Sequence, residues 1–165
     1  GRFEAFSRSL FDDGWQGLED HPPFKTQVFE ENPKTIITRN ESPDISFDRS
    51  INPYRGCEHG CSYCYARFMR QVTGHKEPWG EFVDVKINAP ELLEKEIRRK
   101  QRGTVWVSGV CDPYQPLEAK YTLTRRCLEI LARNSWPVII QTRSPLVLRD
   151  IDIIREAGGL RLASR

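Results

Sequence analysis

Three cysteines crowd into one short stretch of the chain and could bind a metal cluster. They are Cys57, Cys61 and Cys64, with three and then two residues between them. Thiolates at this spacing can surround one cuboidal iron–sulfur cluster, each sulfur binding a different iron. The fourth iron then keeps an open position, as catalytic metals elsewhere do. Gly56 and Gly60 would let the backbone bend tightly around the cluster. The spacing therefore predicts a [4Fe–4S] site.

A structural zinc ion is the main alternative for this loop. Zinc usually closes its shell with paired Cys-x-x-Cys knuckles, and the loop contains one such pair, Cys61 and Cys64. His59 could complete a zinc shell, although its place in the loop favours a supporting role. Chance clustering of buried cysteines is a second alternative. A zinc ion would make the chain a structural or interaction module without radical chemistry.

Composition narrows the class of protein. The chain has 165 residues, enough for roughly one domain. Its 25 basic and 23 acidic residues are too balanced to indicate a nucleic-acid binder by bulk field. We find no apolar run of about eighteen residues and no signal-peptide core. We therefore expect no membrane association. The chain begins with Gly1 instead of Met, which suggests a trimmed chain or a fragment.

The use of cysteine points to a reducing compartment. Five cysteines are an odd number, and three of them are crowded together. A disulfide framework would need an even and more widely spread set. Thiolates that bind metal in the cytoplasm explain the pattern better. Cys127 falls on the apolar stripe of a predicted helix and is expected in the core.

From about residue 50, buried strands alternate with helices. We expect strands over residues 50–54, 82–87, 104–110, 137–142 and 160–163. We expect helices over residues 63–72, 91–101 and 150–157, and a further helix that begins after Thr122, whose side chain would cap it. This alternation predicts parallel pairing with right-handed crossovers, and so an α/β fold. Residues 1–49 have turn chemistry and no long apolar period, so we expect an extended N-terminal arm with one short strand at Thr35–Thr38.

Reactive side chains follow several of these strands. The cysteine loop follows the first, Cys111 and Asp112 follow another, Arg143 follows the next, and Ser164 follows the last. Parallel sheets bind ligands beyond the carboxyl ends of their strands. Asp112 could accept hydrogen bonds from a cofactor, or simply begin an Asp–Pro turn. Arg143 could hold a carboxylate in a fork geometry, or be an exposed loop arginine.

The sequence around the cysteines resembles the radical S-adenosylmethionine (radical SAM) enzymes. The shared signature is Cys-x3-Cys-x2-Cys with an aromatic residue, Tyr63, before the last cysteine. The wider string from Asn52 to Arg67 is similar to the branch related to spore photoproduct lyase, often called DNA repair photolyase-like. Two later blocks resemble the same branch: Asp112–Pro116 with Glu118 and Thr124–Arg126, and Thr142–Asp150. The resemblance covers about residues 33–160.

The resemblance implies a fold and an activity. The fold would be an incomplete (β/α)6 barrel with about four strand–helix units over residues 50–165, truncated at its C-terminal end, behind an N-terminal extension over residues 1–49. The open iron would bind S-adenosylmethionine and cleave it reductively to a 5′-deoxyadenosyl radical that abstracts a substrate hydrogen. Such an enzyme, of lyase type, would take electrons from flavodoxin or ferredoxin, with nucleic acid as the leading substrate class by analogy.

The same resemblance suggests roles for single residues. Tyr63 would contact the adenosyl group, or else shield the cluster from water. Arg143 stands where the family often has Lys, and Asp112 would bind the ribose or amino group of the cofactor. The branch has a hydrogen-donating cysteine at the position of Gly109. Cys111 lies two residues on, and so on the same side of a strand; it would be a hydrogen donor, or simply a small buried residue.

A weaker signal concerns nucleic acid. Near the cysteines, basic and aromatic side chains interleave: Arg55, Arg67 and Arg70 with Tyr54, Tyr63, Tyr65 and Phe68. Such a set could contact phosphates and bases. The same side chains could instead seal the cysteine loop.

Overall fold

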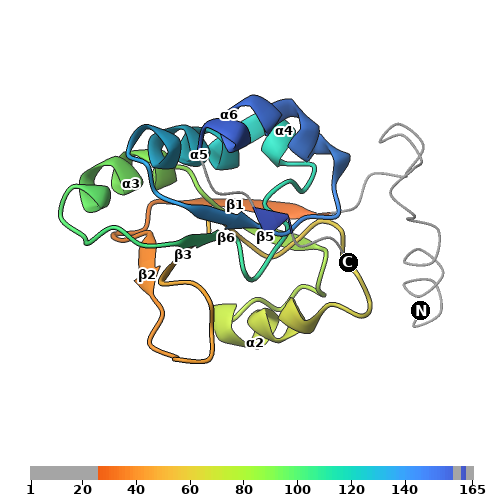
Figure 1. Ribbon diagram of the computed structural model, residues 1–165. Coiled ribbons are helices and arrows are strands. Elements are labelled where there is room, and N and C mark those ends of the chain that lie inside the picture. Colours follow the sequence, from red (N-terminus) through yellow and green to blue (C-terminus); the bar gives the residue numbers. More distant parts are fainter. Residues whose placement is uncertain (1–25, 158–160, 163–165) are drawn as a thin grey trace.

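Two β-sheets with helices packed beside them form the described part of the chain (Figure 1). The computed structural model describes residues 26–157 and 161–162. The strands are β1 (Gln27–Glu31), β2 (Ile37–Arg39), β3 (Arg49–Ile51), β4 (Tyr54–Arg55), β5 (Phe82–Lys86), β6 (Val105–Val107), β7 (Val138–Ile140) and β8 (Arg161–Leu162). The helices are α2 (Met69–Thr73), α3 (Ala89–Ile97), α4 (Glu118–Tyr121), α5 (Leu123–Arg133) and α6 (Ile151–Glu156), with 3₁₀ turns η1 (Tyr65–Phe68) and η2 (Pro145–Asp150).

The larger sheet has the parallel order expected from the buried strands. Its strands run β2-β3-β6-β7-β8, and all neighbouring pairs are parallel except the antiparallel edge pair of β2 with β3. Ile51, Val107, Ile140 and Leu162 are aligned across four strands. The carboxyl ends of these strands are therefore level, and the loops that follow them emerge along one edge. The α/β fold is confirmed.

The smaller sheet shows that the N-terminal region contributes more strand than expected. Its order is β1-β5-β4, with β1 parallel to β5. Both β1 and β2 lie within residues 1–49, where we expected one strand near Thr35–Thr38. The missed strand, β1, is an edge strand on which Val28 and Phe29 are each 39% exposed. Such a strand needs no alternation of buried and exposed side chains, so the sequence carries no period there.

The strand expected over residues 50–54 is two short strands in different sheets. β3 pairs with β6, whereas β4 pairs with β5. Pro53 separates them and has no N–H to donate to a ladder. The Pro53 carbonyl still accepts from Lys86 N at 3.0 Å, and the Ile51 carbonyl accepts from Ser108 N at 2.8 Å. This bent segment joins the two sheets and leads directly into the cysteine loop.

The main core lies between the larger sheet and the helices α3, α5 and α6, which cover one of its faces (Figure 1). Its buried members include Ile51, Leu93, Val105, Val107, Cys127, Leu131, Val138, Ile140 and Ile154. Cys127 is fully buried, as its place on the α5 stripe predicted. Thr122 occupies the N-cap position of α5, as predicted, but its side chain makes no capping hydrogen bond. Instead, a carboxylate oxygen of Glu118 accepts from Thr124 N at 2.6 Å.

Helix α2 lies on the opposite side of the sheets from α3, α5 and α6 (Figure 1). Together with η1 it occupies the region where one helix was expected over residues 63–72. None of the helices in the described ranges is both long and apolar enough to cross a membrane.

Candidate metal centre

The cysteine loop runs from β4 to η1 and turns twice on itself. Gly60 N donates to the Cys57 carbonyl at 3.2 Å, and Cys64 N donates to the Cys61 carbonyl at 3.2 Å. All three thiols are free, with Cys57 buried and Cys61 and Cys64 partly exposed. The two turns present three sulfur atoms from one short segment.

Glycines are required where the loop passes β5. Gly56 has φ +83°, and a Cβ there would lie 2.4 Å from the carbonyl oxygen of Phe82. Gly60 and Gly80 lie back to back, so a Cβ on Gly80 would be 2.9 Å from the Gly60 Cα. L-residues with a side chain rarely adopt such positive φ values. The expected role of Gly56 and Gly60 in bending the loop is borne out by this geometry.

Two of the three thiols, those of Cys57 and Cys64, belong to a small hydrophobic cluster. Cys57, Ala66, Trp79 and Phe82 are buried together, with Cys64, Met69 and Cys111 packed at the edge. Burial raises the pKa of Cys57 well above its usual value, and the neighbouring Cys111 adds to this. Burial also raises the pKa of Cys64. Thiolates at these two buried positions therefore need a compensating positive charge, which a bound metal supplies.

A single metal ion and a cluster would need the ligands of the loop in different arrangements. Among the residues that the structure describes, no three His, Cys, Asp or Glu side chains are placed to hold one metal ion. A zinc ion needs four ligands converging to about 2.0–2.3 Å. A cuboidal cluster instead takes each thiolate on a different iron. His59 directs its Nε2 toward Asp112, 3.5 Å from a carboxylate oxygen, which fits the supporting role expected of it.

Asp112 ties together the ends of two strands and the cysteine loop. One oxygen accepts from Tyr114 N at 2.8 Å and Thr142 Oγ1 at 2.6 Å, and the other accepts from Arg143 N at 3.0 Å. Burial alone would raise the pKa of this carboxyl, but the contacts with His59, Thr142 and Arg143 outweigh it and lower the pKa. Asp112 therefore begins a turn, as the Asp–Pro alternative predicted, and it is also an anionic group at the site.

Arg143 reaches from the end of β7 back to the cysteine loop. Its Nη1 lies 2.8 Å from the Cys61 sulfur and 3.0 Å from the Tyr63 hydroxyl. Tyr63 is 78% exposed, and the neighbouring Tyr65 donates through its hydroxyl to the Gly109 carbonyl. The structure therefore brings Arg143 and Tyr63 together at one of the three cysteines, as the positions after the strands predicted. Ser164 lies outside the described residues.

Cys111 is close to the cysteine loop, but the strand expected to present it is shorter than predicted. The strand expected over residues 104–110 ends at Val107, and Ser108 turns the chain with φ +61°. The alternation argument for Cys111 was therefore wrong. Its thiol donates to the Tyr54 carbonyl at 3.3 Å and packs against the hydrophobic cluster that contains Cys57. Burial raises the pKa of Cys111 to about 12.

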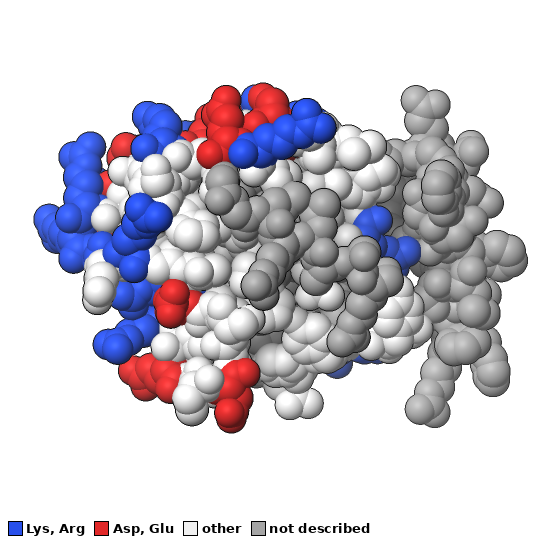
Figure 2. Space-filling model, viewed as in Figure 1, with Lys and Arg blue, Asp and Glu red and all other residues white. Residues whose placement is uncertain are grey.

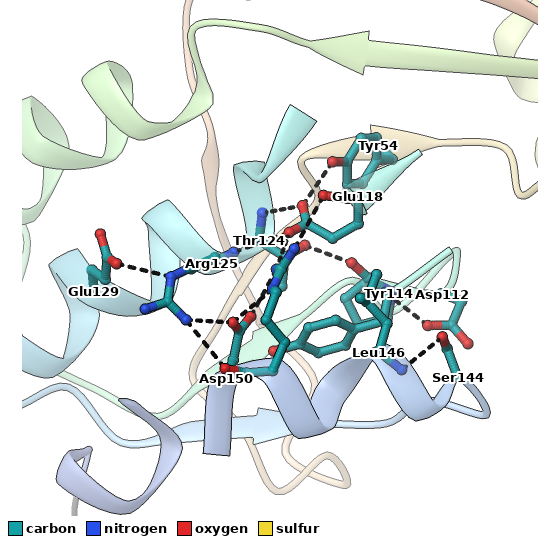
Figure 3. A network of polar contacts seen from close by, with 12 residues as sticks. Tyr54, Asp112, Tyr114, Glu118, Thr124, Arg125, Glu129, Ser144, Leu146 and Asp150 are labelled. Carbon is teal, nitrogen blue, oxygen red and sulfur yellow. Dashed lines mark hydrogen bonds and ion pairs between the residues drawn. The ribbon is translucent and has the colours of Figure 1, made fainter. Parts of the chain in front are cut away.

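A buried ion-pair network is joined to the start of the cysteine loop through Tyr54 (Figure 3). Glu118 and Asp150 are fully buried. The Arg149 guanidinium bridges them, at 2.6 Å from Glu118 and 2.8 Å from Asp150, and Arg125 lies 2.7 Å from Asp150. Tyr54, just before the loop, donates to Glu118 at 2.7 Å. Sequence reasoning assigned no role to Glu118, Arg125, Arg149 and Asp150, although they lie in the two later blocks of the family resemblance.

The interleaved basic and aromatic set near the cysteines is only partly available to a ligand. Tyr54 is buried and Arg55 pairs with Glu31 at 2.9 Å. Tyr63, Tyr65 and Phe68 are exposed. In the view of Figure 2, Lys and Arg gather at the end where α3 lies, and acidic side chains mix with them along the helices. This face shows no field of one sign.

Comparison with known proteins decides the family. The model of the Radical SAM superfamily matches residues 51–164. The chain belongs to the radical SAM superfamily. Membership implies a [4Fe–4S] cluster and S-adenosylmethionine as the superfamily's general cofactors. The structure contains the four strand–helix units expected of a partial radical SAM fold: β3/β4 with α2, β5 with α3, β6 with α5 and β7 with α6.

Individual radical SAM relatives are longer than this chain. It is 33% identical over 138 residues to an uncharacterized protein of Methanocaldococcus jannaschii, covering 84% of this chain and 51% of that protein. It is 36% identical over 119 residues to an uncharacterized protein of Mycobacterium tuberculosis, covering 69% and 35%. The chain therefore spans about half or less of their length.

A solved structure has a similar fold. It is a spore photoproduct lyase mutant with bound AdoMet and dinucleoside spore photoproduct. The TM-score is 0.60 at 16% sequence identity, covering 89% of this chain and 44% of that one. The fold of this radical SAM chain is therefore similar to that of the solved structure.

Proposed function

We propose that this chain is the cluster-binding part of a radical SAM enzyme, with Cys57, Cys61 and Cys64 as the ligands of a [4Fe–4S] cluster. The observation that carries the proposal is the contact of Arg143 with Cys61 at 2.8 Å. It brings a cation from the end of a parallel strand to a loop with three free thiols. When bound, the cluster supplies the electron that cleaves S-adenosylmethionine to methionine and a 5′-deoxyadenosyl radical, which abstracts a hydrogen atom from substrate.

The chain's own residues would bind and orient the cofactor. Arg143 would donate to the carboxylate of S-adenosylmethionine, for which its planar fork is suited. Asp112 would orient Arg143, because it accepts from that residue's backbone N–H at 3.0 Å. Tyr63 would cover the adenosyl group with its exposed ring. The apolar side chains around Cys57 would exclude water from the radical chemistry.

Cys111 would return a hydrogen atom to the substrate radical. With a pKa of about 12 its thiol carries a hydrogen at neutral pH. Transfer would break the S–H bond, form a C–H bond on substrate and leave a thiyl radical on Cys111. One electron from the external donor and one proton would then restore the thiol.

The substrate class and partners belong to the same proposal. Nucleic acid is the substrate we favour, with a lyase-type reaction, because the similar fold of known structure was solved with a dinucleoside photoproduct. Flavodoxin or ferredoxin would supply electrons. Free thiols and an oxygen-sensitive cluster suit the reducing cytoplasm.

Anaerobic reconstitution with iron and sulfide tests the proposal. We expect about four irons per chain and broad absorbance near ~400 nm, and 5′-deoxyadenosine when dithionite and S-adenosylmethionine are added. Alanine variants of Cys57, Cys61 or Cys64 should lose most of the iron, whereas Cys127→Ala should retain it. A colourless protein that keeps stoichiometric zinc and takes up no iron would establish the structural zinc module instead.

A further inference from the structure

Gln115 makes two hydrogen bonds to the backbone on either side of Cys57. Its side chain is fully buried in the loop between β6 and α4. The amide oxygen Oε1 accepts from Glu58 N at 3.0 Å, and Nε2 donates to the Gly56 carbonyl at 3.2 Å. One side chain thus pairs with the donor and the acceptor that flank the first cysteine of the loop.

This pairing restricts the backbone of Gly56, the residue before Cys57. Gly56 has φ +83° and no side chain, so its backbone has more accessible conformations than that of any other residue type. The Gln115 amide imitates the backbone of a neighbouring strand and holds the peptide groups before and after Cys57. Rotation at Gly56 would break at least one of the two bonds and leave a buried polar group unpaired.

Gln115 is itself held in place. Glu58 reaches the other way, and its carboxylate accepts from Leu117 N at 2.6 Å. Gln115 N donates to the Asp112 carbonyl at 3.3 Å, and Glu118 N donates to the Gln115 carbonyl at 2.8 Å. The loop after β6 and the cysteine loop therefore hold each other reciprocally, and the contact sits directly at the most buried of the three cysteines.

We propose that Gln115 is a positioning residue that holds Cys57 in the conformation in which it binds the cluster. The inference rests on the proposed function, since it concerns a ligand of the same cluster. Next to Cys61, the Ser62 carbonyl accepts from the exposed side chain of Arg67 at 2.9 Å, whereas Gln115 is buried and pairs on both sides of Cys57. Loss of Gln115 should therefore affect Cys57 selectively.

The test compares Gln115→Met with the wild-type chain. Met keeps the length and volume but neither hydrogen bond. Gln101→Met, at an exposed position, is the matched control. In the metal-free protein, iodoacetamide should alkylate Cys57 about tenfold faster in Gln115→Met, with the rate at Cys61 unchanged, as read by peptide mass spectrometry. After reconstitution, the variant should lose iron to a chelator several-fold faster than wild type and Gln101→Met.

A second variant keeps the test decisive if Gln115→Met does not fold. Gln115→Leu also removes both hydrogen bonds with a side chain of similar size, so both rates should rise as in Gln115→Met. Equal Cys57 alkylation and equal iron loss in a folded variant and wild type would overturn the inference. If wild type takes up no cluster, the proposed function fails, while the alkylation ratio in metal-free protein still decides whether Gln115 holds Cys57.

Discussion

The guanidinium of Arg143 lies 2.8 Å from the sulfur of Cys61, although 82 residues separate them in the sequence. The same nitrogen is 3.0 Å from the hydroxyl of Tyr63. The contact joins the carboxyl end of β7 to the cysteine loop, and so places a positive charge where both a metal ligand and an anionic cofactor group are proposed.

We expect Arg143→Ala to weaken binding of S-adenosylmethionine to the reconstituted protein by about 10–100-fold, because hydrogen bonds to charged groups contribute roughly 1.5–3 kcal/mol. Arg143→Lys should lose less, since it keeps the charge without the planar fork. Equilibrium dialysis with labelled cofactor measures the change. The iron content should stay near that of wild type. Lost iron with unchanged affinity would instead give Arg143 a role in holding Cys61 alone.

The convergence of Asp112 with Arg143 was predictable from the sequence. Each follows a β-branched apolar run, and the carboxyl ends of neighbouring parallel strands lie at one edge of a sheet. The apolar run before Cys111 predicted neither the end of β6 nor the direction of the Cys111 side chain. The chain turns at Ser108 with a positive φ, and a non-glycine residue gives no sequence signal for such a turn.

The contacts behind the site were not predictable in the same way. Gln115 stands between prolines in a turn, and nothing local shows that its amide would be buried against Gly56 and Glu58. The capping hydrogen bond of α5 was assigned to Thr122 because Thr commonly caps helices. Glu118 took that role through a one-turn helix, α4, that is too short to show a period. Such pairings depend on tertiary packing and leave no periodicity.

Gly56→Ala should destabilise the chain strongly. Alanine at φ +83° would be strained, and its Cβ would lie 2.4 Å from the Phe82 carbonyl oxygen. We expect a loss of about 3 kcal/mol in the free energy of unfolding. Gly74→Ala is the matched control, because Gly74 has φ +72° with nothing within 4 Å of a Cβ. It should cost about 1 kcal/mol from backbone strain alone. Equal urea midpoints for the two variants would contradict the proposed clash.

Cys111 should resist alkylation at neutral pH. Burial raises its pKa to about 12, so roughly one thiol in ten thousand is ionised at pH 8. Cys61 and Cys111 are both partly exposed, so the low ionised fraction of Cys111 is what should slow it, and Cys61 should react first in the native metal-free protein. Peptide mass spectrometry after timed iodoacetamide treatment orders the two sites. In 6 M urea (about the concentration needed to unfold a small domain), Cys111 should become as reactive as Cys61. Rapid native labelling of Cys111 would contradict its raised pKa and weaken its proposed role as a hydrogen donor.

Arg149→Met should reveal how far the buried network stabilises the fold. The change leaves the carboxylate of Glu118 without its bridging cation, and breaking a buried pair in this way costs about 3 kcal/mol or more. Arg126→Met is the matched control. The Arg126 ion pair with Glu91 is exposed, at 45% and 58%, and its loss should cost less than about 1 kcal/mol. Urea unfolding at pH 7 gives both values.

The stability difference between wild type and Arg149→Met should depend on pH. Burial alone would raise the pKa of Asp150, but the hydrogen bonds from Arg149 and Arg125 outweigh it and lower the pKa. A carboxyl with a lowered folded pKa stabilises the protein fully above its unfolded pKa, about 3.9, and loses that contribution as the pH falls through the folded pKa. The stability gap between wild type and Arg149→Met should therefore be largest near neutral pH and narrow below about pH 4. A gap that stays constant down to pH 3 would mean that Arg149 stabilises through packing on its neighbours and not through the carboxylates.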